Sequence, residues 1–187
     1  MAFPEHSNIL IIGGARSGKS DYAQELAMSL PQPVLFVATA EAGDEEMRQR
    51  IQAHREKRPS TWKTLESPVS VGDRIRNETG SIPTVIIDCI TLLVNNVFNK
   101  YTGLDGELID SDLIEKDLTA EIESLVECMS EVNASFIVVT NEVGHGLVPA
   151  SGMSRLYRDM LGKTNRVLAK NMDEVYMMVA GLPVKIK

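Results

Sequence analysis

The sequence predicts an α/β fold in which helices flank a mostly parallel β-sheet. Two observations predict it: apolar runs without alternation recur along the chain, and segments with helical spacing separate them. The apolar runs, rich in Val, Ile or Met, are residues 9–12, 34–37, 85–87, 136–139 and 175–179. Strands covered by helices on both faces have this composition. Ligands of such folds bind beyond the carboxyl ends of the strands.

The helical segments show apolar residues on one side. The clearest covers residues 111–132, and another covers roughly 153–171. In the first, residues at three- and four-residue steps are apolar: Ile114, Leu118, Ile122, Leu125, Met129 and Val132. Residues 99–107 are mostly polar and include two glycines, so we expect a surface loop there. The length of 187 residues, without a repeat or a low-complexity linker, predicts one domain over residues 1–187.

Composition excludes several classes of protein. The net charge of -7 argues against a general nucleic-acid binder, but it allows a small anionic ligand in a local basic pocket. No apolar run is long enough for a membrane span, and the N-terminus lacks the regions of a signal peptide. We therefore expect a cytoplasmic protein without stable membrane insertion. Cys89 and Cys128 fit neither a metal-ligand spacing nor a disulfide framework, so we expect two buried thiols.

The first apolar run leads into the pattern Gly13-x-x-x-x-Gly18-Lys19-Ser20. This is a P-loop: its glycines permit a tight turn, so backbone N–H groups can point at the phosphates of a nucleotide. Lys19 would reach the β- and γ-phosphates. Ser20 would ligate Mg²⁺ at the start of a helix whose dipole favours the anion. Residues 21–30 have the helical spacing that this interpretation requires. The alternative is a glycine-rich turn that binds nothing.

Polar side chains follow other predicted strands. Asp88 ends the run at 85–87, as in a Walker B motif, and could hold Mg²⁺ directly or through water. It could instead cap the helix that starts at Ile90. The run at 136–139 is followed by Thr140, Asn141 and Glu142. These three either cap the following glycine turn or contact a ligand.

A helical segment at residues 44–58 concentrates positive charge in this acidic protein. Its cations are Arg48, Arg50, Arg55, Lys57 and Arg58. His54 shares a helix face with two apolar residues. It either packs against the core, or acts as a nucleophile toward a triphosphate that the cations hold. The other two histidines, His6 and His145, could be ordinary surface residues.

Four motifs together resemble a known family. They are Gly13-Gly-Ala-Arg-Ser-Gly-Lys-Ser20, Arg50-Ile-Gln-x-His54, Thr140-Asn-Glu-Val-Gly-x-Gly-x-Val-Pro149 and Gly181-x-Pro-Val-Lys-Ile-Lys187. In this order they resemble the bifunctional adenosylcobinamide kinase/adenosylcobinamide-phosphate guanylyltransferases of cobalamin assembly. The resemblance implies that ATP or GTP phosphorylates the aminopropanol hydroxyl of adenosylcobinamide. It also implies that GTP guanylylates a histidine, and that GMP then passes to adenosylcobinamide phosphate, which gives adenosylcobinamide-GDP.

The resemblance also implies roles for individual residues. His54 corresponds to the guanylylated histidine, although Ala53 stands where many relatives carry a second histidine. Lys19 and His54 would be catalytic, and Ser20 and Asp88 would hold the metal. The implied nucleotide-binding residues are Gly13, Gly14, Ala15, Arg16, Ser17, Gly18, Lys19, Ser20, Ala38, Thr39, Ala40, Arg55, Glu56, Lys57, Arg58, Glu66 and Asp88. Some relatives carry Glu at the position of Asp88, which leaves direct or water-mediated metal contact open.

The resemblance further implies a recombinase-like P-loop sheet and a homotrimer. The substrates would be a corrinoid and the Mg²⁺ complex of ATP or GTP, with no tightly bound organic cofactor. Two rival hypotheses remain. A different small-molecule kinase, in which His54 is structural, predicts no covalent nucleotide. A regulatory nucleotide-binding module predicts binding without consumption. The occurrence of His54 within a basic segment disfavours both.

Overall fold

The computed structural model describes residues 6–41, 45–56, 58–101 and 110–187. Strands and helices alternate along the chain, which confirms the predicted α/β class. The strands are β1 (Asn8–Gly13), β2 (Val34–Ala38), β3 (Lys63–Glu66), β4 (Thr84–Asp88), β5 (Ser135–Asn141), β6 (Glu174–Val179) and β7 (Leu182–Lys185). The helices are α1 (Lys19–Met28), α2 (Glu45–Glu56), α3 (Val71–Glu78), α4 (Ile90–Asn99), α5 (Ser111–Glu131) and α6 (Gly152–Asn171).

The strands form a seven-stranded sheet in the order β3-β2-β4-β5-β1-β6-β7. All neighbours pair in parallel except β6 and β7, which are antiparallel. Strand β5 therefore lies between β1, which leads into the P-loop, and β4, which ends at Asp88. This insertion is the recombinase-like arrangement of a P-loop sheet, as the resemblance implied.

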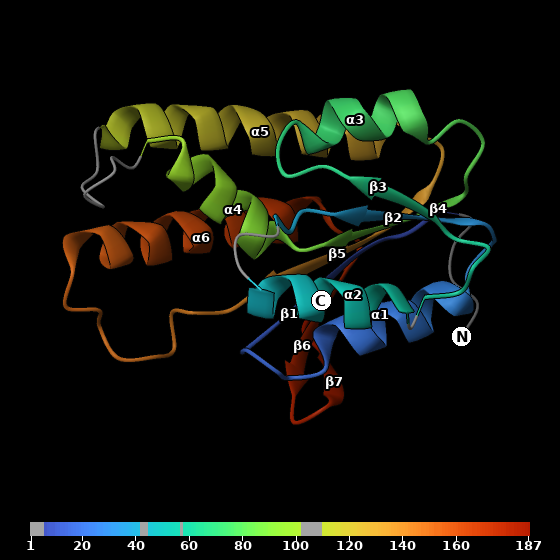
Figure 1. The fold of residues 1–187 in the computed structure, drawn as a ribbon, viewed down its shortest axis with the longest axis horizontal. Helices are drawn as coiled ribbons and strands as arrows, with labels where there is room; N and C mark the ends of the chain where they lie inside the picture. Colours follow the sequence, from blue (N-terminus) through green and yellow to red (C-terminus); the bar gives the residue numbers. More distant parts are fainter. Residues whose placement is uncertain (1–5, 42–44, 57, 102–109) are drawn as a thin grey trace.

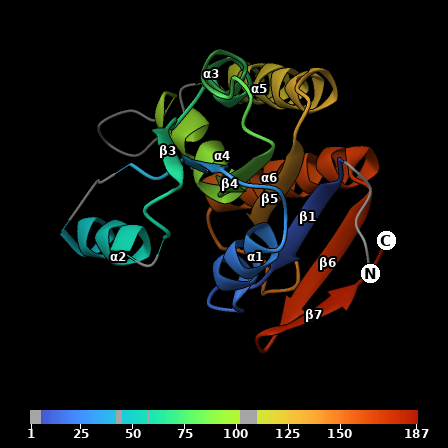
Figure 2. The same cartoon turned by 90° about the vertical axis from the view of Figure 1, so that its right-hand side faces the viewer.

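Helices cover both faces of the sheet, as the continuous apolar runs predict. On one face α1 contributes Ala23, Leu26 and Ala27 to a buried cluster. On the other, α3, α4, α5 and α6 supply most of the helical residues of a second, larger cluster. Figure 2 shows α2 on the same face as α1, with α3 and α5 on the opposite face. Among the described residues, no helix is both long and apolar enough to cross a membrane.

The strand register brings the predicted site to one edge of the sheet. Asp88 pairs with Ala38 on one side and with Val139 on the other, while Gly13 pairs with Asn141. Because β5 alone separates the two strands, the ends of β1 and β4 lie ~10 Å apart across the sheet. Glu66 pairs with Ala38 at the same edge. Figure 1 shows α1 leaving this edge from the blue P-loop.

Three elements were not predicted, and some boundaries differ. Strands β3 and β7 are the two outermost strands of the sheet. Because one side of an outermost strand contacts solvent, its sequence does not need a continuous apolar run. Helix α3 is eight residues long and buries only one side. Helix α1 ends at Met28, two residues before the predicted end. The loop predicted at 99–107 begins one residue late, because α4 includes Asn99; residues 102–109 lie outside the described part.

Candidate active site

The P-loop joins β1 to α1 through a tight turn. Gly18 caps α1 with a φ of 91°, a left-handed conformation that glycine adopts without cost. A Cβ on Gly13 would lie 2.8 Å from the carbonyl oxygen of Met178, so β6 also excludes a side chain there. Lys19 is 7% exposed, and its Nζ donates to the carbonyl of Gly14 at 2.6 Å. The lysine is therefore folded back into the loop, where the phosphates of a nucleotide would compete for it.

Asp88 and Lys19 act electrostatically on the same thiol, that of Cys89, which is partly exposed, whereas Cys128 is buried as expected. Burial and the charge of Asp88 raise the pKa of Cys89 to about 11, and the charge of Lys19 opposes that rise. Both charges thus lie close to Cys89. Helix α4 is capped by Cys89, with no side-chain capping bond, so the alternative role of Asp88 as N-cap is wrong. The carboxylate is half-buried at the end of β4, on the sheet edge that carries the P-loop.

The donor set suits Mg²⁺. Ser20 lies in the first turn of α1 and supplies a hydroxyl, while Asp88 supplies a carboxylate. Mg²⁺ in nucleotide sites commonly uses one or two such oxygens and completes its shell with phosphate and water. Among the described residues there is no cluster of three or more His, Cys, Asp or Glu side chains that could hold a metal by itself. This arrangement fits a metal that arrives with its nucleotide.

Thr39 fixes the backbone beside Asp88. Its hydroxyl accepts from the N–H of Cys89 at 2.8 Å and donates to the carbonyl of the same residue at 2.7 Å. The Thr39 carbonyl in turn accepts from the side chain of Asn96 at 2.8 Å. Thr39 is fully buried, so its side chain holds β2 and β4 in register instead of facing a ligand. Its neighbours Ala38 and Ala40 lie at the same edge.

Arg58 stacks on an aromatic ring beside this edge. Its guanidinium carbon lies 3.5 Å from the ring centroid of Phe36, a fully buried residue of β2. Burial lowers the pKa of Arg58, and the charge of Asp88 opposes that shift. Its buried Nε has no hydrogen-bond partner among the described residues. A half-buried cation with an unused donor therefore lies within electrostatic reach of Asp88.

The other predicted residues of the basic segment differ in position. Arg55 donates to Glu66 at 2.7 Å, and both side chains are more than half exposed. Glu56 is exposed and accepts from Gln52 at 2.8 Å. His54 belongs to α2, but its side chain is outside what the structure describes, as is the whole of Lys57.

The polar residues at the carboxyl end of β5 and just after it are mainly structural. The hydroxyl of the fully buried Thr140 donates to the side chain of Asn165 at 2.8 Å. The backbone N–H of Asn141 donates to the hydroxyl of Thr91 at 2.8 Å. The carboxylate of Glu142 accepts from the N–H two residues on, which confirms the turn-capping interpretation for this residue. No local sequence pattern marks Thr91, Asn165 or Phe36, because each acts through a partner on a distant element.

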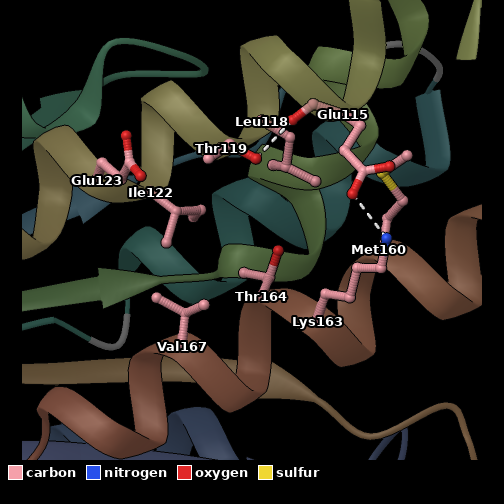
Figure 3. A pocket seen from close by; sticks show the side chains of 9 residues that line it. All are labelled: Glu115, Leu118, Thr119, Ile122, Glu123, Met160, Lys163, Thr164 and Val167. Carbon is pink, nitrogen blue, oxygen red and sulfur yellow. Dashed lines mark hydrogen bonds and ion pairs between the residues drawn. The ribbon is translucent and has the colours of Figure 1, made fainter. Parts of the chain in front are cut away.

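A separate groove lies between α5 and α6, on the face of the sheet opposite α1. It has a volume of about 100 Å³ and is lined by Glu115, Leu118, Thr119, Ile122, Glu123, Met160, Lys163, Thr164 and Val167 (Figure 3). Lys163 and Glu115 form an ion pair of 2.6 Å across it. None of the predicted site residues lines this groove, so it takes no part in the site at the strand ends.

We predict that Phe36→Leu weakens nucleotide use through Arg58. A cation–π contact contributes roughly 0.5–2 kcal/mol, so KM for GTP should rise by about 2- to 30-fold. The matched control is Phe136→Leu, which removes an equally buried ring from the opposite cluster. Steady-state kinetics and thermal melting of both variants separate the effects. Equal KM changes in the two variants would show that lost packing, and not the stacked cation, is responsible.

Relatives of this chain are known over nearly its whole length. The family model for cobinamide kinase / cobinamide phosphate guanyltransferase matches residues 9–186. The bifunctional adenosylcobalamin biosynthesis protein CobU of Escherichia coli is 39% identical over 180 residues, covering 96% of this chain and 99% of the relative. CobP of Pseudomonas aeruginosa, with the same description, is 39% identical and covers 95% and 96%. CobU of Salmonella typhimurium is also 39% identical, with coverages of 96% and 99%.

The fold has a more distant match among solved structures. The ATPase domain of another protein superposes with a TM-score of 0.52 at 13% identity, covering 94% of this chain and 70% of that one. At this identity the match supports the P-loop fold alone. The family model and the relatives extend over nearly the whole chain. The chain therefore belongs to the cobinamide kinase / cobinamide phosphate guanyltransferase family.

Proposed function

We propose that this chain phosphorylates the aminopropanol hydroxyl of adenosylcobinamide with ATP or GTP, and then converts the product to adenosylcobinamide-GDP through a guanylyl-histidine at His54. One observation carries the proposal beyond family membership. Lys19 and Arg58, from two separate segments, both lie within electrostatic reach of the region around Asp88 at the strand ends. Phosphoryl and nucleotidyl transfer depend mainly on positioning and on neutralising phosphate charge, which this arrangement supplies.

In the first reaction, Lys19 would bind the β- and γ-phosphates at the P-loop. Mg²⁺, held by Ser20 and Asp88 with the nucleotide, would supply neutralising charge. The hydroxyl oxygen of the corrinoid arm forms a bond to the γ-phosphorus, while the bond to the β–γ bridging oxygen breaks. ADP or GDP leaves, and the hydroxyl proton passes to solvent.

In the second reaction, an imidazole nitrogen of His54 forms a bond to the α-phosphorus of GTP, and pyrophosphate leaves. The phosphate of adenosylcobinamide phosphate then attacks the same phosphorus and releases the histidine. Arg55 and Arg58 would neutralise charge on the transferred group. Arg58 suits this role because it is a half-buried cation within electrostatic reach of Asp88, and a guanidinium binds phosphate oxygens through charge-assisted hydrogen bonds.

We further propose a homotrimer, as the family resemblance implies, and a cytoplasmic location, where ATP and GTP are abundant. Sedimentation equilibrium of the purified chain measures the first. A mass of one or two chains at all concentrations would exclude a stable trimer.

The proposed function is tested with purified protein, adenosylcobinamide, Mg²⁺ and either nucleotide. Chromatography with mass detection should show adenosylcobinamide phosphate with ATP and adenosylcobinamide-GDP with GTP. Chelation of Mg²⁺ should abolish both products. Nucleotide binding without consumption in the presence of the corrinoid would instead support a regulatory module. Phosphorylation without GDP transfer would support a simple kinase.

A further inference from the structure

Each polar group of Thr39 has a partner within the protein. Its backbone N–H donates to the carbonyl of Asp88 at 3.3 Å. Its hydroxyl accepts from the N–H of Cys89 and donates to the carbonyl of the same residue. Its own carbonyl accepts from the side chain of Asn96. Because Thr39 is also fully buried, it contributes to the site through the groups that it holds.

Thr39 holds the backbone from which the Asp88 carboxylate projects. The last pair of the parallel ladder between β2 and β4 joins Ala38 to Asp88. Beyond that pair, both polar atoms of the peptide between Asp88 and Cys89 bind Thr39: the carbonyl accepts from its N–H, and the N–H donates to its hydroxyl. The threonine side chain therefore extends the connection between the strands past the point where the ladder ends.

Asn96 of α4 holds Thr39 in turn. Its side chain is buried, and its Nδ2 donates to the carbonyl of Thr39 at 2.8 Å and to that of Pro68 at 2.9 Å. Pro68 belongs to the segment after β3, where the N–H of Ser67 donates to the carbonyl of Ala38 at 2.9 Å. One buried amide thus joins the end of β2 to the segment after β3, and this fixes Thr39 from the side opposite β4.

The position of the Asp88 carboxylate matters because Mg²⁺ is strict about geometry. The ion requires nearly octahedral coordination with oxygen distances of about 2.0–2.1 Å. Its proposed ligands, Ser20 and Asp88, come from strands that β5 separates, so no direct pairing of β1 with β4 sets their distance. Groups that hold a metal ligand in place commonly affect metal affinity as strongly as 10- to 100-fold, roughly. Thr39 is in the position to act in this way on Asp88.

We propose that Thr39, held by Asn96, is a positioning residue for Asp88, and that its hydroxyl determines how tightly the nucleotide site binds Mg²⁺. Thr39 acts through the backbone of Asp88 and touches neither the metal nor the nucleotide. Without the hydroxyl, the buried N–H of Cys89 loses its partner, and the peptide after Asp88 shifts to find another. The P-loop makes none of these contacts, so binding of nucleotide without metal stays as it is. This inference rests on the proposed function, because it takes Mg²⁺ from that reaction.

The test compares Thr39→Val, which keeps the shape and removes the hydroxyl, with Thr39→Ser, which keeps the hydroxyl. The matched control is Thr84→Val. Thr84 is equally buried at the other end of β4, and its hydroxyl donates to the carbonyl of Pro31 at 2.7 Å.

Calorimetric titration with α,β-methylene-GTP, without corrinoid, measures nucleotide binding while neither reaction proceeds. The ratio of Kd in EDTA to Kd in Mg²⁺ gives the contribution of the metal. This ratio should fall about tenfold or more in Thr39→Val, with Kd in EDTA unchanged. Thr39→Ser and Thr84→Val should keep the ratio of the wild type.

Kinetics supply a second measurement. In Thr39→Val the Mg²⁺ concentration for half-maximal phosphorylation should rise about tenfold or more, and saturating Mg²⁺ should restore kcat. Asn96→Leu, which has a similar volume, should shift both quantities in the same direction by less. This variant tests the same contacts if Thr39→Val does not fold.

An unchanged ratio of the two Kd values in either folded variant would overturn the proposal. Equal weakening of binding in Mg²⁺ and in EDTA would also overturn it, because general damage to the fold acts on both. The same holds if Mg²⁺ does not strengthen binding to the wild-type chain. The expected ratios in a wild-type chain that makes neither corrinoid product would support the positioning role and overturn only the proposed function.

Discussion

Lys19→Ala should lower kcat/KM for phosphoryl transfer by about 100- to 1000-fold, the loss typical of removing one charge-stabilising group from a transition state. Part of the loss is in binding, where a charge-assisted hydrogen bond contributes roughly 1.5–3 kcal/mol. The Lys19 ammonium is nearly buried and already donates to the carbonyl of Gly14. Its position inside the loop means that water cannot readily replace it. Initial rates with ATP and with GTP, at varied concentrations, measure the effect.

The matched control for Lys19 is Lys163→Ala. Lys163 pairs with Glu115 across the α5–α6 groove, and its side chain is 61% exposed. Exposed pairs of this kind contribute little, so activity and melting temperature should stay near those of the wild type. Circular dichroism checks that Lys19→Ala is folded. A folded Lys19→Ala variant with unchanged kcat/KM would exclude nucleotide use at this P-loop.

Sequence alone predicted the parts of the site that depend on short stretches of chain. The P-loop is one such part, because strand, turn and helix follow each other within twenty residues. Asp88 is another, because it directly follows an apolar run and strand ends share one edge of a parallel sheet. The order of the strands could not be read from local patterns. The family resemblance implied only a recombinase-like sheet, and the order itself came from the structure.

The remaining features depend on contacts between distant elements. Phe36 and Arg58 are separated by a strand end and a helix, and nothing in either segment marks the stack between them. The outermost strands, β3 and β7, were not predicted because one side of each contacts solvent, so their sequences lack a continuous apolar run. Strand β7 contains a proline and has no buried residue, which hides it from a search for apolar runs.

His54→Ala should separate the two proposed reactions. The variant should still convert adenosylcobinamide to its phosphate, because γ-phosphoryl transfer to a hydroxyl proceeds by direct in-line attack. It should form no adenosylcobinamide-GDP, because the second reaction requires a protein nucleophile in the proposed scheme. Incubation with α-labelled GTP should label the wild-type protein and not the variant. The label should be lost in acid and retained in alkali, as expected for a phosphoramidate.

The matched control is His6→Ala, which removes an exposed histidine just before β1, at the sheet edge opposite the P-loop. It should be labelled like the wild type and should make both products. Lys19→Ala should lose both products, since the two reactions would share the P-loop. Comparison of Lys19→Ala with His54→Ala therefore distinguishes a phosphate site that serves both reactions from a nucleophile that serves only the second.

Labelling of His54→Ala at the wild-type level would show that another residue is the nucleophile. Loss of both products in a His54→Ala variant that circular dichroism shows to be folded would mean that the histidine also serves the kinase step. The proposal that the P-loop serves both reactions, and His54 of α2 only the second, would then be wrong.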